Sequence, residues 1–420
     1  MSINRSLYIG LSGMNANSLA LNVVSDNIAN MNTVGYKAGR SVFQEMLGQS
    51  VMGVGGTSMA GGGVGFAKID KMFQQGSLLG TGGELDLAIG GEGFFSLQGE
   101  VDGVRGTFYG RNGQFSRDAD GFITNVTGLR LMGYQANAAG EISAELGPLQ
   151  IDDSPIPPTA TSKLSLDMNL NANAEVQTFD ITAPGDTSDF MSSATVYDAQ
   201  GKQTQVDVFW TKTADNTWAY NAVVDGGLVD GGTKGEPTLV GSGALEFDAA
   251  GNLTTDPVTL GTFAFTPVGG QEQTISFDVT GTTQFAEKDS SVDKIKQNGS
   301  QSGTFQHVNI DTDGRIKGTF SNGEEKVLGQ VALARFKSTA GLRVHGNGLY
   351  GQTFDSGNVI MGAANSNGRG QIVAGALEQS NVDLATEFTN MIIAQRGYQA
   401  NSRSIQTADQ VIQEAVNLKR

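Results

Sequence analysis

Apolar residues recur at intervals of seven at both ends of the chain, and this repeat constrains the fold more than any other feature of the sequence. A seven-residue spacing places side chains on one face of a helix. Because a lone helix with one narrow apolar stripe is marginal in water, we expect residues 1–34 and 381–420 to pair as a coiled coil, with further copies of the chain covering the remaining apolar surface. The stripe residues are Leu7, Leu11, Met14, Leu21, Val24 and Ile28 near the start, and Leu384, Phe388, Met391, Tyr398, Ile405 and Ile412 near the end.

The segment "SDNIANMNTVGYK", residues 25–37, marks the end of the first helix, because its asparagines interrupt the apolar repeat. At the other terminus, Ser380 and Asn381 are candidate caps for the second helix, since their side chains can accept hydrogen bonds from free backbone N–H groups. The repeat leaves one simpler alternative open, in which the two helices pack separately on a globular core.

Residues 48–65, "GQSVMGVGGTSMAGGGVG", contain eight glycines. Glycine loses more conformational freedom on ordering than any other residue, so we predict a loop or hinge without regular structure. This stretch is either a compliant connector or a plain surface loop. We assign residues 35–70 together with 362–380 to an extended connector rich in glycine and asparagine.

Short alternating segments bounded by glycine and asparagine predict β-hairpins over residues 71–145 and 286–361, which we assign to one inner β domain. A turn cassette recurs, in which Gly follows Asp or Asn by three positions. The Asp or Asn side chain bonds to its own backbone and the glycine supplies a positive φ. A calcium loop is not indicated, because such loops place glycine sixth rather than fourth. The cassettes begin at residues 118, 137, 198, 248 and 311.

The segment 146–285 differs in composition from both of its flanks and is predicted to be an inserted, outer β domain. Residues 146–290 hold 20 Asp and Glu against 5 Lys, which accounts for nearly all of the net charge of −16. All eight prolines and both tryptophans fall in the same window. An acidic surface repels nucleic acid and anionic membranes, and its simplest role is to keep the domain soluble. The whole chain is thus predicted to be multi-domain and mainly β, with α-helices at its N- and C-termini.

Reactive side chains are scarce, so we predict no catalytic, cofactor-binding or metal-binding residues and do not expect an enzyme. The chain has no cysteine, and His307 and His345 are its only histidines. The match of "GNGLYG", residues 346–351, to a dinucleotide motif is interpreted as a β-turn, because no helix is predicted after it. A Ser-His-Asp arrangement assembled in space stays open. The N-terminal region has no unbroken apolar run, so we expect neither a Sec-type signal peptide nor membrane insertion.

Four segments, in order, resemble the axial proteins of the bacterial flagellum, the family of rod and hook subunits. They lie at both ends of the chain and before the long insertion, which makes the chain similar to the hook branch rather than to the shorter rod proteins. The segments are "SGMNANSLALNVVSDNIANMNTVGYKAGRSVFQEML" at 12–47, "LDLAIGGEGFFSLQ" at 85–98, "YGRNGQFSRDADGFITNVTGLRLMGYQ" at 109–135, and "GALEQSNVDLATEFTNMIIAQRGYQANSRSIQTADQVIQEAVNL" at 375–418.

The resemblance implies a structural subunit that self-assembles into a curved hollow tube, a universal joint that passes torque from rod to filament. It implies that Asn27, Asn30, Asn32 and Thr33 satisfy backbone groups where the first helix unravels against neighbouring copies. The implied partners are other copies of the chain, the rod protein, the hook cap protein, the hook–filament junction protein and the flagellar type III export apparatus. The implied location is extracellular, at the hook. The alternatives are a flagellar distal rod protein, or a secreted β-rich adhesin or enzyme.

Overall fold

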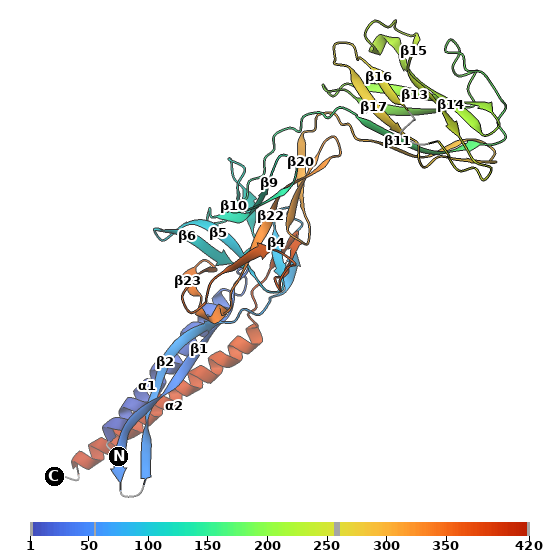
Figure 1. Ribbon diagram of the computed structural model, residues 1–420. Helices are drawn as coiled ribbons and strands as arrows, with labels where there is room; N and C mark the ends of the chain where they lie inside the picture. Colours follow the sequence, from blue (N-terminus) through green and yellow to red (C-terminus); the bar gives the residue numbers. More distant parts are fainter. Residues whose placement is uncertain (1–2, 54–55, 256–260, 418–420) are drawn as a thin grey trace. The chain divides into compact units, whose positions relative to one another are not determined.

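The computed structural model describes residues 3–53, 56–255 and 261–417. Within them the chain forms two compact units. The first comprises residues 1–152, 307–319 and 325–420, and the second comprises 153–306 and 320–324. Strands dominate both units, and long helices lie at the two ends of the chain (Figure 1). The prediction of a mainly β fold with N- and C-terminal helices is confirmed.

The first unit contains both long helices and most of the strands. Its elements up to the insertion are α1 (Ile3–Ala29), β1 (Gly39–Gly53), β2 (Gly56–Lys71), β3 (Leu78–Gly80), β4 (Leu87–Gly90), β5 (Phe94–Val101), β6 (Val104–Gly110), β7 (Phe115–Arg117), β8 (Ile123–Asn125), β9 (Arg130–Ala136) and β10 (Ile142–Pro148). Those after it are β20 (Phe305–Ile310), β21 (Arg315–Phe320), β22 (Glu325–Arg335), a 3-10 turn (Thr339–Gly341), β23 (Arg343–Gly346), β24 (Leu349–Gly351), β25 (Ile360–Ala363), β26 (Gln371–Ala374), β27 (Ala376–Glu378) and α2 (Leu384–Asn417).

The two terminal helices lie side by side, and glycines bring them close together (Figure 1). A Cβ on Gly10 would lie 2.8 Å from the Ile405 side chain, and one on Gly397 would lie 2.5 Å from Asn17 Oδ1. Larger residues at these positions would force the helices apart. Glycine weakens each helix by about 1 kcal/mol relative to alanine, so the close approach is obtained at the expense of helix propensity.

The glycine-rich stretch 48–65 is not a loop, apart from residues 54 and 55, which lie outside the described residues, so that prediction was wrong. β1 and β2 pair as a long antiparallel hairpin, from Gly39 opposite Lys71 to Gly53 opposite Gly56. The hairpin lies along α1, where the backbone N–H of Val64 donates to Ser12 Oγ at 3.2 Å. The strand ladder and the neighbouring helix together offset the ordering entropy of the glycines, which local sequence alone does not reveal.

The main sheet of the first unit has the strand order β20-β21-β22-β9-β5-β6-β24-β23. It therefore combines strands from before and after the insertion. Its aromatic core includes Phe94, Tyr109, Phe336 and Tyr350. Two shorter sheets likewise pair a strand after the insertion with one before it, β26 with β4 and β27 with β3. β27 is the last strand before α2.

The second unit consists of a five-stranded and a four-stranded sheet with one hydrophobic core shared between them. Trp210 and Trp218 are fully buried in that core, as are Phe263 and Phe277. Its elements are β11 (Lys163–Asn171), β12 (Phe190–Tyr197), β13 (Gln203–Ala214), β14 (Thr217–Asp225), a 3-10 turn (Gly226–Leu228), β15 (Pro237–Glu246), β16 (Thr262–Phe265), β17 (Gln273–Asp278), β18 (Thr283–Phe285) and β19 (Ser291–Gln297).

All five turn cassettes form as predicted. In each, the Asp or Asn Oδ1 accepts backbone N–H groups two and four residues later, as Asp311 does from Asp313 and Arg315. The five glycines have φ between 78° and 86°. The "GNGLYG" stretch is likewise a turn, between β23 and β24, with Asn347 and Gly348 both at positive φ. This is the conformation of a two-residue hairpin turn.

Candidate assembly site

The predicted stripe on α1 is only partly covered in a single copy. Val24 is buried, and Leu11 is exposed. The remaining members are half-buried, namely Leu7, Met14, Leu21 and Ile28. The face of α1 that meets α2 runs instead through small and polar residues. They are Gly10, Gly13 and Asn17, and a Cβ on Gly13 would lie 2.7 Å from the Asn401 side chain.

On α2 the predicted stripe divides in the same way. Met391, Ile405 and Ile412 are half-buried, whereas Leu384, Phe388 and Tyr398 are exposed. Ile405 is brought against α1, over Gly10. The most buried positions of α2 are Glu387 and Ala394, with Asn401 half-buried at the next position of the same seven-residue spacing.

The sequence-based prediction missed this contact face of small and polar residues between α1 and α2, because it followed apolar residues alone. The available signal was the repetition of small and polar residues at the same period of seven between the apolar ones. Apolar side chains are therefore left on the outward faces of both helices. The exposed ones are Tyr8, Ile9, Leu11, Leu384, Phe388, Ile392, Ile393, Tyr398 and Val411.

The asparagine-rich run closes the end of α1 onto the first strand. Asn27 is 1% exposed, and its Nδ2 donates to the Gly39 carbonyl at 2.8 Å while its Oδ1 accepts from the Gly39 N–H at 2.7 Å. Asn30 Nδ2 donates to the Asp26 carbonyl at 2.9 Å, and Thr33 Oγ1 donates to Asn30 Oδ1 at 3.1 Å. The Asn27 bonds satisfy both backbone groups of Gly39, the first residue of β1, whereas the Thr33 bond joins two side chains.

Not all of the predicted polar residues take part. Asn32 is exposed, and its side chain makes no hydrogen bond to any residue that the structure describes. Tyr36, at the end of the same run, donates to Asp26 Oδ2 at 2.9 Å. Burial and this bond to Asp26 raise the pKa of Tyr36 well above its ordinary range.

A buried ion triad lies where this run meets the start of α2. Lys37 Nζ is 2.6 Å from Glu378 Oε1, and Arg111 Nη1 is 3.2 Å from Glu378 Oε2. The side chains of Lys37 and Glu378 are fully buried. Burial lowers the pKa of Lys37, and the Glu378 carboxylate opposes that shift. Such a triad is stable only when every charge is paired and hydrogen-bonded.

Backbone groups complete this junction. Lys37 Nζ also donates to the Gln74 carbonyl at 2.8 Å, and Glu378 Oε1 accepts from the Gly76 N–H at 2.9 Å. Asn381 Oδ1 accepts from the Ala38 N–H at 2.8 Å. The segment after α1, the segment before α2 and the segment between β2 and β3 are thereby joined at one place.

Asn381 thus binds the segment between α1 and β1 and is not the helix cap that we predicted. The cap is Asp383, whose Oδ1 accepts from the Thr386 N–H at 2.7 Å. Hydrogen bonds from Thr386 hold the pKa of Asp383 below its ordinary value. Asn381 is drawn away from the helix because its amide also donates to the Met72 carbonyl at 2.8 Å, a partner too distant in sequence to predict.

Four family models match the chain in order. They are flagellar basal body rod protein (7–37), flagellar hook protein FlgE/F/G D1 domain (88–188), flagellar basal body protein FlaE D2 domain (166–300), and flagellar basal body rod FlgEFG protein C-terminal (373–418).

Full-length relatives carry the flagellar hook protein name. The chain is 34% identical to the flagellar hook protein FlgE of Salmonella typhimurium, over 97% of this chain and 98% of that one. It is also 34% identical to the hook protein of Borreliella burgdorferi, over 99% of both chains. The chain belongs to the flagellar hook protein family. It is a structural subunit of the hook, and its location is the bacterial flagellum.

A solved hook protein shares the fold. The crystal structure of Helicobacter pylori flagellar hook protein FlgE2 superposes with a TM-score of 0.52 at 17% identity, covering 72% of this hook-family chain and 100% of that chain. Within the described residues, no helix is long and apolar enough to cross a membrane. The same residues hold no group of three or more acidic or histidine side chains placed to bind a metal ion.

Proposed function

We propose that the chain self-assembles into a curved hollow tube through its paired terminal helices. The observation that carries this proposal is the apolar surface that one copy leaves on the outward faces of α1 and α2. Tyr8 is 71% exposed and Ile393 is 63% exposed. Large apolar side chains left exposed in such number are typical of protein interfaces. Identical copies can cover them, and contacts that do not close into a ring build an open helical polymer.

In this proposal residues 1–34 and 381–420 form the coiled coil of the inner wall, and the predicted stripe residues contact neighbouring copies. Residues 35–70 with 362–380 connect that wall to the inner β domain of 71–145 and 286–361, of which 286–306 pack within the second unit. The acidic domain of 146–285 lies outermost. The junction of Lys37, Arg111 and Glu378 supports a mechanical role, because it ties the helices to the β domain through buried ion pairs.

The tube acts as a universal joint that transmits torque from rod to filament. Its partners in this proposal are the rod protein, the hook cap protein, the hook–filament junction protein and the flagellar type III export apparatus, which delivers the chain to the cell exterior. The matches of rod-family models to 7–37 and 373–418 support packing against the rod through the same terminal segments.

Electron microscopy of the purified full chain tests self-assembly. We expect tubes or curved rods from the unaltered chain, formed alone or from short rod seeds. The double variant Ile392→Ser with Ile393→Ser should remain as single copies in sedimentation, with its far-UV circular dichroism retained. Val176→Ser, at a valine of the second unit that is also exposed, is the matched control and should assemble normally.

The result that would overturn self-assembly is a full chain that stays monodisperse over a range of salt and protein concentrations, with rod seeds present. Tubes formed equally well by the Ile392→Ser and Ile393→Ser double variant would reject the outward faces of the helices as the assembly surface.

A further inference from the structure

One phenylalanine is fully exposed at the tip of a fixed loop between β24 and β25. Phe354 is 100% exposed. The loop is held by its neighbours, since the Thr353 N–H donates to Ser356 Oγ at 3.0 Å, and Thr353 Oγ1 donates to the Gly341 carbonyl at 2.5 Å. A pre-ordered loop loses little further entropy when it binds. The loop therefore holds the Phe354 ring in solvent, where a partner molecule can contact it.

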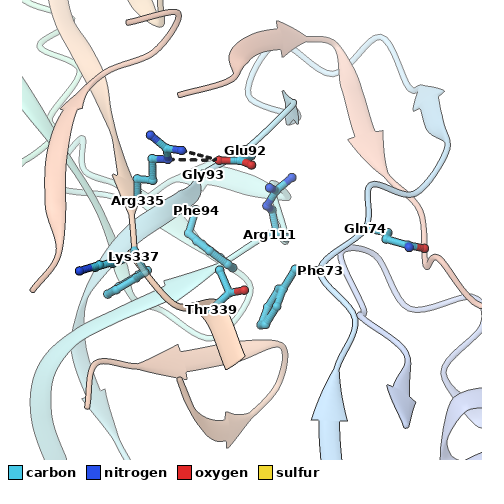
Figure 2. Close-up of a pocket in the computed structure, with 10 residues that line it drawn as sticks. Phe73, Gln74, Glu92, Gly93, Phe94, Arg111, Arg335, Lys337 and Thr339 are labelled. Atoms are coloured by element: carbon cyan, nitrogen blue, oxygen red, sulfur yellow. Dashed lines mark hydrogen bonds and ion pairs between the residues drawn. The ribbon is translucent and has the colours of Figure 1, made fainter. Parts of the chain in front are cut away.

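The same unit contains a pocket of 460 Å³ in which Phe73 and the edges of the buried rings of Phe94 and Phe336 lie among charged and polar side chains (Figure 2). Phe73 and Phe94 meet edge to face with ring centroids 5.3 Å apart, and Phe336 lies 5.9 Å from Phe94. In Figure 2 the first two rings lie between Lys337 and Gln74. Because an apolar cavity of about 150 Å³ already holds a benzene ring, this pocket is large enough for a phenylalanine side chain.

The charges around the pocket favour an anionic group beside that ring. Arg335 and Glu92 pair with each other at 3.1 Å. Arg111 pairs with Glu378, but its Nε is buried without a hydrogen-bond partner. Lys337 lines the pocket and has no hydrogen bond or ion pair with any residue that the structure describes. One cation at the pocket is thus uncompensated.

The exposed loop supplies the matching charge. Asp355 follows Phe354, is itself exposed, and makes no side-chain hydrogen bond or ion pair within the described part of the chain. An aromatic ring with an adjacent carboxylate complements an aromatic pocket with an adjacent ammonium group. Phe354 does not occupy the pocket of its own copy, where its ring is fully exposed.

We propose that the Phe354–Asp355 loop of one copy inserts into the pocket formed by Phe73, Phe94 and Phe336 of a second copy. Asp355 then lies beside Lys337. This inference rests on the proposed self-assembly and adds to it a contact between the β-rich parts of neighbouring copies. It gives the polymer a second attachment, separate from the apolar faces of the helices.

Disulfide cross-linking between two single-cysteine chains tests the contact directly. The chain has no cysteine of its own, so there is no background reaction. One chain carries Asp355→Cys, which keeps the phenylalanine, and the other carries Thr339→Cys at the pocket wall. We expect a cross-linked dimer when the two chains are co-assembled and oxidised. A mixture of Asp355→Cys with Val126→Cys, at an exposed valine of the same unit, should give none.

Assembly measurements separate this inference from the proposed function. Phe354→Ala should raise the critical concentration for tube formation at least tenfold, and Phe354→Tyr should restore it. Normal tubes from Phe354→Ala, together with no cross-link to Thr339→Cys, would overturn the loop contact and leave self-assembly standing. Absence of tubes from the unaltered chain would overturn both. A cross-link to the Val126→Cys control as strong as that to the pocket would also refute the assigned contact.

Discussion

Neutralising Glu378 should detach the helical pair from the β domain. Its carboxylate accepts from Lys37 at 2.6 Å, from the Gly76 N–H at 2.9 Å and from Arg111 at 3.2 Å, and its side chain is 0% exposed. Glu378→Gln is nearly isosteric, so it creates no cavity that would itself lower the free energy of unfolding. It leaves two buried cations without a counter-charge, and removing one partner of a buried ion pair costs about 3–5 kcal/mol.

Urea unfolding followed by two probes measures this loss. Both tryptophans belong to the second unit, so their fluorescence reports that unit, whereas helical circular dichroism reports the first. Given a denaturant slope of about 1–3 kcal/mol per molar urea, the midpoint of the helical transition should fall by more than about 1 M urea. The midpoint of the fluorescence transition should not change.

The matched control for Glu378→Gln is Glu100→Gln. Glu100 pairs with Arg105 at 3.2 Å, but both side chains are largely exposed, and such pairs contribute about 1 kcal/mol or less. Equal effects of the two substitutions would refute the argument that burial gives the junction its strength. A fluorescence transition that shifted together with the helical one would refute the assignment of the loss to the first unit.

Three further predictions concern the same region and are measured by urea unfolding or amide exchange. Gly35→Ala should destabilise the first unit clearly more than Gly82→Ala, because both glycines have φ near +70° but only at Gly35 would a Cβ meet backbone, 2.5 Å from the Asn112 nitrogen; equal losses would contradict this. Asn27→Ala should cost about 1–3 kcal/mol, because it leaves buried backbone groups unpaired, whereas Asn32→Ala should stay within about 0.5 kcal/mol. Because the folded-state pKa of Asp383 lies below its ordinary value of 3.8, its stabilisation is present above that pH and is lost as the pH falls through the lower folded value. Asp383→Asn should therefore remove the acid-induced loss of amide protection at the start of α2, and an unchanged pH dependence would reject the cap.

Features decided by neighbouring residues could be predicted from the sequence. The five turn cassettes need only an Asp or Asn side chain and a glycine three positions later, and all five formed. The terminal helices were also predictable, because their seven-residue period extends over several turns. The seam between them was not, since it combines apolar residues with glycine, asparagine and alanine at the same period.

Features decided by distant residues could not be predicted. The β1–β2 hairpin contradicts the local preference of its glycines because strand pairing and α1 supply the missing stabilisation. Lys37 and Glu378 are separated by 341 positions, and no local pattern indicates that a lysine and a glutamate so far apart are both buried. The aromatic pocket likewise collects residues from three separate segments, around Phe73, Phe94 and Phe336.

The long sequence separation across the junction also sets an order of events in folding. The second unit is closed by residues 153–306 and a short return segment, so most of its contacts are available before the C-terminal part of the chain emerges from the ribosome. The Lys37–Glu378 ion pair and the α1–α2 contact can form only after the C-terminal part of the chain has been synthesised, because Glu378 and α2 are made last. Contacts that close such long loops form late and slowly. During most of synthesis α1 therefore has the β1–β2 hairpin as a neighbour but lacks α2.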